Sequence, residues 1–112
     1  MRVNDDRPGM TNVPKPYAKF AAEFPEVLVK NEDLGTYIHD KAGPLDEKTR
    51  WLIKLGISAA SRHQTGVSTH VSKARAAGAT EAEIRHALLL VIPTCGFPTF
   101  MEAYREYDET PK

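Results

Sequence analysis

Cysteine is nearly missing from this chain, since Cys95 is the only one. A disulfide within the chain is therefore impossible, and so is a metal site built from four thiolates of one chain. Redox chemistry that needs a second thiol to resolve an oxidised sulfur is excluded as well. We interpret Cys95 as an unreactive thiol in the first instance.

Excess charge and long apolar runs are also missing. Fifteen Lys and Arg residues balance fifteen Asp and Glu residues, and no basic run of the kind that binds a phosphate backbone occurs. No segment approaches the roughly 18 consecutive apolar residues of a membrane span, and the polar start of the chain has no apolar signal region. We expect neither nucleic acid nor a membrane as a partner, and we predict a cytoplasmic protein.

The composition is that of a folded domain, with 41% hydrophobic and 27% charged residues among 112, which is ordinary globular usage. The length suits one domain. We predict a flexible N-terminal arm over residues 1–13, a helical domain over 14–108 and a tail over 109–112. So small a domain leaves apolar helix faces uncovered, which favours self-association.

Periodicity predicts an all-α fold of about six helices, because apolar residues recur at helical spacing and no alternation of period two appears. We expect a short helix near 17–24, a second from Pro25 that ends at Gly43, and a central buried helix from about 46 to 62 with Ile53 and Ile57 on one side. The fourth helix should begin at about residue 64 or 65.

The remaining helices have clear end signals. Gly78 ends the fourth helix, and Thr80 with Glu83 forms a capping box that opens an apolar run over 84–92. We expect Pro93 to interrupt that run. A last amphipathic helix follows over about 97–107.

Two histidines carry the most interesting chemistry. If residue 63 belongs to the fourth helix, His63 and His70 share an apolar face with Val67 and Val71. A neutral imidazole there can give or take a proton near pH 7. The alternative is a structural histidine whose ring nitrogens bond to backbone carbonyls.

A metal site is not predicted. Seven residues along one helix separate His63 from His70 by about 10.5 Å, too far to share an ion. The helical His-Glu-x-x-His pattern is missing too, because position 66 is Gly66. No cofactor is predicted either.

Several motifs, in order, resemble the carboxymuconolactone decarboxylase-like family. They are Leu45-Asp46-Glu47-Lys48-Thr49-Arg50, an Ala-rich helix, His70, the stretch from Ala76-Ala77-Gly78 to Ile84, and Cys95-Gly96-Phe97-Pro98. The similarity covers about residues 15–107. It implies a six-helix domain that assembles as a homo-trimer or hexamer, with a pocket near the paired central helices and the neighbouring subunit.

The family's alkylhydroperoxidase-D-like branch carries Cys-x-x-Cys followed by His, with a glutamate twelve residues before the first Cys. Here the Cys positions hold His63 and Gly66, the glutamate position holds Trp51, and only His70 is kept. Thiol peroxidase activity is therefore disfavoured.

The decarboxylase branch has His at position 70 and no Cys pair, but usually Arg where His63 stands. This resemblance implies loss of carbon dioxide from a small carboxylated lactone or related acid, with His70 and His63 as catalytic residues. Trp51, Arg62, Cys95 and Phe97 would bind the substrate, with Arg62 or His63 on its carboxylate. Two alternatives stay open, namely a non-catalytic oligomer that binds a small ligand and a residual redox activity of Cys95.

Overall fold

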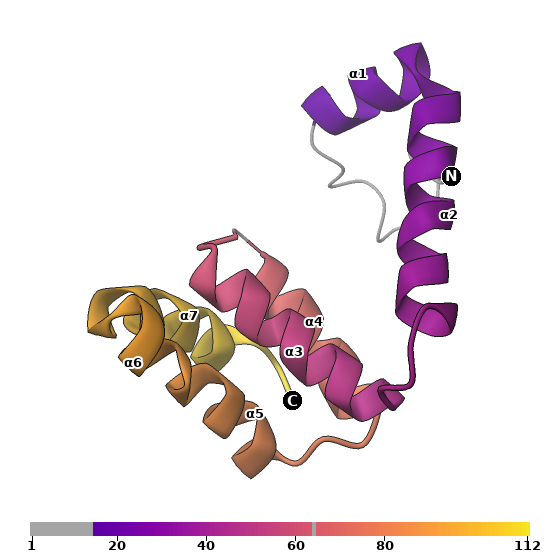
Figure 1. Cartoon of the computed structure of the whole chain (residues 1–112). Helices are drawn as coiled ribbons and strands as arrows, with labels where there is room; N and C mark the ends of the chain where they lie inside the picture. The colour runs from indigo at the N-terminus through magenta and orange to yellow at the C-terminus, as the bar shows by residue number, and fades with distance from the viewer. Residues whose placement is uncertain (1–14, 64) are drawn as a thin grey trace. The chain divides into compact units, whose positions relative to one another are not determined.

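The computed structural model describes residues 15–63 and 65–112, and all regular structure in those ranges is helical (Figure 1). The helices are α1 (Lys15–Glu23), α2 (Pro25–Lys41), α3 (Glu47–Ala60), α4 (Gly66–Ala76), α5 (Glu81–Leu89), α6 (Val91–Cys95) and α7 (Phe97–Glu109). This confirms the predicted all-α class. The helices form two compact units that divide between Gly43 and Pro44, and each is described by itself.

The first unit is the pair α1 and α2. Phe20 of α1 packs against Phe24, with ring centroids 5.6 Å apart, and Pro25 is the first residue of α2. Proline suits that position because its missing N–H would have no partner inside the helix. Leu28 is buried, but Leu34 remains 58% exposed, so the unit leaves part of its apolar stripe uncovered.

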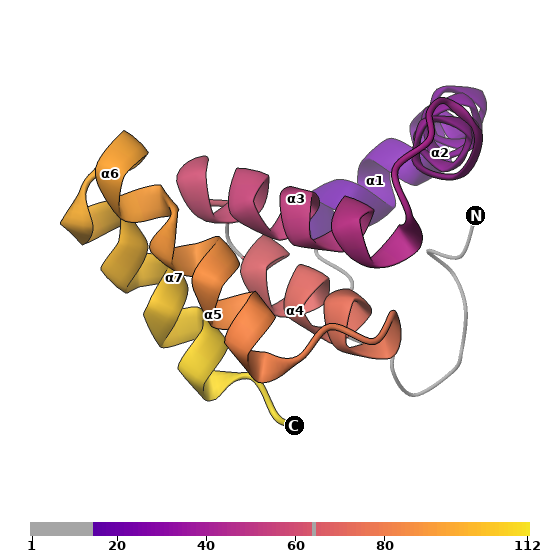
Figure 2. The same ribbon diagram turned by 60° about the horizontal axis from the view of Figure 1, so that its bottom comes forward.

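The second unit packs α3 against α4, with α5, α6 and α7 completing the core (Figures 1 and 2). Its most deeply buried side chains come from three of these helices: Leu55, Val67, Val71, Ile84 and Leu88. Phe100 and Tyr107 of α7 close the core. No helix of the described residues reaches the length and apolar character that crossing a membrane requires.

The predicted helix ends are confirmed at three places. Asp46 caps α3, its carboxylate accepting from the Thr49 amide at 2.8 Å. The capping box of Thr80 and Glu83 is formed at α5. Gly78 follows α4 with φ near 95°, a conformation that glycine adopts without strain.

The apolar run is interrupted as predicted, but the break comes before Pro93. The break falls at Leu90, and Pro93 lies in the first turn of α6. The N–H groups of a first helical turn have no partner inside the helix, so proline costs little there.

The fourth helix also begins later than predicted. Its first residue is Gly66, so His63 lies in the loop before α4 rather than on its face. Arg62 and Thr65 have positive φ values of 56° and 65°, which a continuing right-handed helix does not allow.

The central helix is buried on one side only, which corrects the expectation of burial all round. Leu55 and Ala59 are fully covered, whereas Ile53 and Ile57 are 45% and 61% exposed. The other four helices of the second unit cover α3 from the α4 and α5 side, and one layer of helices cannot surround it.

The last described residues pack against the rest of the second unit. Thr110 is buried, and its hydroxyl donates to the Glu106 carbonyl at 2.7 Å. The Pro111 carbonyl accepts from Arg75 at 2.8 Å. The predicted tail thus has defined contacts, while the predicted arm over 1–13 lies outside the described residues.

Candidate functional site

The centre of the candidate site is a hydrogen-bonded pair contributed by the two paired helices. Nδ1 of His70, on α4, lies 2.7 Å from Oγ of Ser58, on α3. Ser58 is only 6% exposed, whereas His70 is partly exposed. The buried hydroxyl therefore fixes the orientation of a ring that solvent can reach.

Trp51 forms one wall beside this pair. It lies on α3 two turns before Ser58, and seven residues bring two helical side chains to the same face. Its ring centroid is 5.9 Å from that of His70. The ammonium groups of Lys54 and Lys73 stand 4.9 and 5.8 Å from the same Trp51 centroid.

His63 approaches the pair from the loop between α3 and α4. A Cβ added to Gly66 would lie 2.6 Å from Nδ1 of His63 and 3.0 Å from Oγ of Ser58. The missing side chain at Gly66 is what allows His63 so near to Ser58. The strained residues Arg62 and Thr65 flank this loop, and such conformations persist only where the surroundings enforce them.

Arg62 is held by α7. Its guanidinium donates to the Thr99 hydroxyl at 3.1 and 3.3 Å and pairs with Glu102 at 3.1 Å. A pocket of about 130 Å³ lies beside it, lined in part by Ser58, His63 and Arg62. Arg62 thus ties the loop to α7.

Cys95 and Phe97 belong to a different part of the molecule, the turn between α6 and α7. Both are exposed, and Phe97 packs on Phe100 with centroids 5.9 Å apart. Thr99, the partner of Arg62, lies two residues after Phe97 on α7. The structure therefore places Trp51 beside His70 and His63 near Ser58, and leaves Cys95 and Phe97 at this turn.

The candidate site offers imidazole, hydroxyl, indole and ammonium groups. Across residues 15–63 and 65–112, no three His, Cys, Asp or Glu side chains are close enough to hold a metal ion. The set can bind an anion beside an aromatic wall and transfer a proton through an imidazole.

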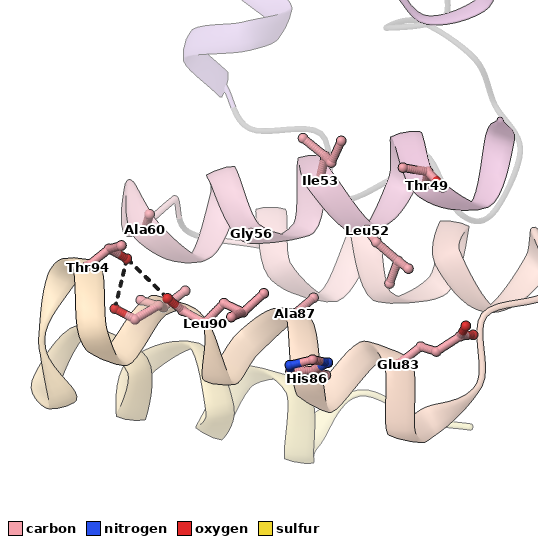
Figure 3. Close-up of a pocket in the computed structure, with 11 residues that line it drawn as sticks. Thr49, Leu52, Ile53, Gly56, Ala60, Glu83, His86, Ala87, Leu90 and Thr94 are labelled. Carbon is pink, nitrogen blue, oxygen red and sulfur yellow. Dashed lines mark hydrogen bonds between the residues drawn. The ribbon is translucent and has the colours of Figure 1, made fainter. Parts of the chain in front are cut away.

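Sequence reasoning missed Ser58. Its position seven residues after Trp51 on one helix face was the available signal. It also missed an apolar groove of about 420 Å³ between α3, α5 and α6 (Figure 3). Leu52, Gly56, Ala87 and Leu90 line it, with Glu83 toward one end and Thr94 toward the other.

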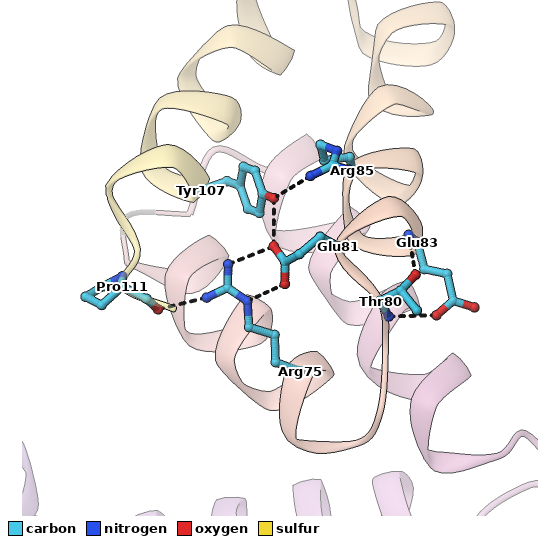
Figure 4. A network of polar contacts seen from close by, with 7 residues as sticks. All are labelled: Arg75, Thr80, Glu81, Glu83, Arg85, Tyr107 and Pro111. Carbon is cyan, nitrogen blue, oxygen red and sulfur yellow. Dashed lines mark hydrogen bonds and ion pairs between the residues drawn. The ribbon is translucent and has the colours of Figure 1, made fainter.

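A polar network joins α4, α5 and α7 (Figure 4). Arg75 donates to both Glu81 oxygens at 2.7 and 2.9 Å, and the Tyr107 hydroxyl donates to Glu81 at 2.8 Å. The Arg75 and Tyr107 hydrogen bonds lower the pKa of Glu81 to about 2. This network stabilises the scaffold on which His70 is placed.

Comparison with known proteins places these observations in a family. A model described as the carboxymuconolactone decarboxylase family matches residues 25–109. The chain is similar to the apo crystal structure of a carboxymuconolactone decarboxylase family protein from Legionella pneumophila, with 28% identity, a TM-score of 0.71 and coverage of 87% of this chain and 88% of that one. A search of curated proteins gives no significant match.

Proposed function

Because the chain belongs to the carboxymuconolactone decarboxylase family, we propose that it processes a small carboxylated lactone or a related acid, with His70 as the proton donor. The bond between Ser58 and His70 carries the proposal. It presents an oriented imidazole beside an aromatic wall, which is what proton delivery to a flat, unsaturated substrate needs.

The position of Ser58 indicates that it orients His70 rather than attacking the substrate. Ser58 is only 6% exposed on the last turn of α3, and its hydroxyl is already engaged by the bond to His70. In the charged imidazole both nitrogens carry protons, and Nδ1 then donates to Ser58. The proton for the substrate therefore leaves from Nε2.

The proposed reaction breaks the bond between a substrate carbon and its carboxylate and releases carbon dioxide. The electron pair left on carbon moves into the conjugated lactone carbonyl and makes a dienolate oxygen. His70 then gives a proton to a carbon of the dienolate and recovers one from water. No oxidant or second thiol takes part, which agrees with the single exposed cysteine.

The test is a panel of lactones that differ in the position of the carboxyl group and in ring unsaturation. We expect release of carbon dioxide together with a change in conjugated absorption for at least one of them. Binding of panel members without turnover would favour the alternative of a non-catalytic ligand-binding protein. Peroxide turnover that disappears in Cys95→Ser would favour redox chemistry instead.

A further inference from the structure

We propose that Lys54 and Lys73 form an anion subsite over Trp51, which receives the carboxylate of a small, flat, unsaturated acid. This inference rests on the proposed function, because it names the group that would hold the substrate beside His70. The three side chains come from the two paired helices, Trp51 and Lys54 from α3 and Lys73 from α4.

The geometry brings two positive charges to one ring. Nζ of Lys54 is 4.9 Å and Nζ of Lys73 is 5.8 Å from the Trp51 centroid. Each distance suits a cation–π contact. Two ammonium groups around one ring repel each other, so an anion between them lowers the energy of both.

Among residues 15–63 and 65–112, no carboxylate forms an ion pair with Lys54 or Lys73. Within the part of the chain that the structure describes, the ion pairs are Lys48 with Glu83, Arg62 with Glu102 and Arg75 with Glu81, and none includes Lys54 or Lys73.

The sequences of α3 and α4 explain why these two lysines have no carboxylate partner on their own helices. α4 has no acidic residue, and the sole acidic residue of α3 is Glu47 in its first turn. The positions three and four residues from Lys54 or Lys73 hold no Asp or Glu, so neither lysine has a helical salt-bridge partner.

The surroundings select the ligand class. Trp51 supplies an aromatic ring at this subsite, and its centroid is 5.9 Å from that of His70. A carboxylate accepting from the lysine ammonium groups would therefore hold its ring near the imidazole. Arg62 is already bound by Thr99 and Glu102, which leaves the lysines as the better anchor.

Trp51 also reports on binding, because it is the only tryptophan. We would titrate the full chain with 2-furoate and with its uncharged counterpart 2-furamide, and follow Trp51 fluorescence. The matched variants are Lys54→Gln with Lys73→Gln, and Lys48→Gln as a control. Lys48 is on the same helix, but its ammonium is 3.0 Å from Glu83, so its charge is already paired.

We expect 2-furoate to bind more tightly than 2-furamide, and added salt to weaken it. The double lysine variant should raise the Kd of 2-furoate about tenfold, since bonds to charged groups have that magnitude, and Lys48→Gln should leave it unchanged. Melting curves by circular dichroism test whether each variant folds. If the double variant does not fold, the single variant Lys73→Gln is measured in its place.

Equal Kd values for 2-furoate in the parent and the double variant would overturn the subsite, and so would equal binding of furoate and furamide. The outcome is separate from that of the proposed function, because 2-furoate is not a lactone. Lysine-dependent furoate binding without turnover of any lactone supports the subsite and counts against catalysis. Lactone turnover that stays the same when both lysines are replaced supports catalysis and counts against the subsite.

Discussion

Oγ of Ser58 lies 2.7 Å from Nδ1 of His70, so a buried hydroxyl on α3 holds the imidazole of α4. We predict that Ser58→Ala lowers kcat about tenfold with a smaller change in KM, because the ring loses its orientation. The free energy of unfolding should fall by about 1–3 kcal/mol, since a ring nitrogen loses its partner. Steady-state kinetics and urea unfolding measure the two effects.

Ser61→Ala is the matched control for that change. Ser61 is exposed, and its hydroxyl donates to the Ser58 carbonyl at 3.3 Å without touching His70. We expect parental kcat and stability. If the kcat of Ser58→Ala equalled that of Ser61→Ala, the result would contradict the claim that the Ser58 hydroxyl orients His70.

Gly66 determines how closely His63 approaches Ser58. Gly66→Ala would place a Cβ 2.6 Å from Nδ1 of His63, so we predict displacement of that ring and a loss of about 1–3 kcal/mol of unfolding free energy. Histidine NMR signals and thermal melting measure both.

Gly56→Ala is the control for Gly66→Ala. A Cβ at Gly56 meets nothing within 4 Å, and alanine favours a helix interior by about 1 kcal/mol over glycine. We therefore expect Gly56→Ala to stabilise the protein. A matching gain in Gly66→Ala would contradict the close contact with His63.

The Glu81 network makes stability depend on pH. Because the folded pKa is lowered to about 2 from 4.5, the unfolded chain takes up this proton first as pH falls. The contribution is complete above the unfolded pKa and disappears as pH falls from about 5 toward 2. Solvent reaches the Arg75–Glu81 pair, so we expect its contribution to the free energy of unfolding to be about 1 kcal/mol.

Glu81→Gln should flatten this part of the stability curve, and Tyr107→Phe should move the loss to higher pH by removing one hydrogen bond from the carboxylate. Urea unfolding between pH 2 and 6 measures the curves. An unchanged curve in Glu81→Gln would show that other carboxylates produce the acid dependence.

We predict a homo-trimer or hexamer in solution. Ile57 of α3 and Leu90 beside the apolar groove are 61% and 57% exposed in the single chain, and a subunit interface would cover such side chains. Light scattering at micromolar concentration should give a multiple of 12.5 kDa. A mass near 12.5 kDa would contradict the assembly.

The fold was largely predictable because helix boundaries depend on local chemistry. Asp46, Thr80 and Gly78 act within a turn of their own position, so their residue types were sufficient. Pro93 correctly signalled an interruption, because a proline disturbs the carbonyl four residues before it. The exact break at Leu90, with a new helix from Val91, was not predicted, because Pro93 itself fits the first turn of the new helix.

The candidate site was predictable only in part. Helical spacing and the family resemblance placed His70 on α4, and the resemblance pointed to Trp51. The roles of Ser58 and of the two lysines depend on the pairing of α3 with α4, because each contact joins residues of different helices. The position of His63 depends on the left-handed conformations of Arg62 and Thr65. These conformations cannot be predicted from the residue types.

The most direct measurement is kcat of His70→Gln with a lactone acid that the parent turns over. Glutamine keeps similar volume and a donor, but it cannot transfer a proton near neutral pH. We predict a fall in kcat of at least about 100-fold, with the melting temperature and the substrate Kd of the parent. A variant that melts like the parent and turns over at the parental rate would contradict His70 as the proton donor.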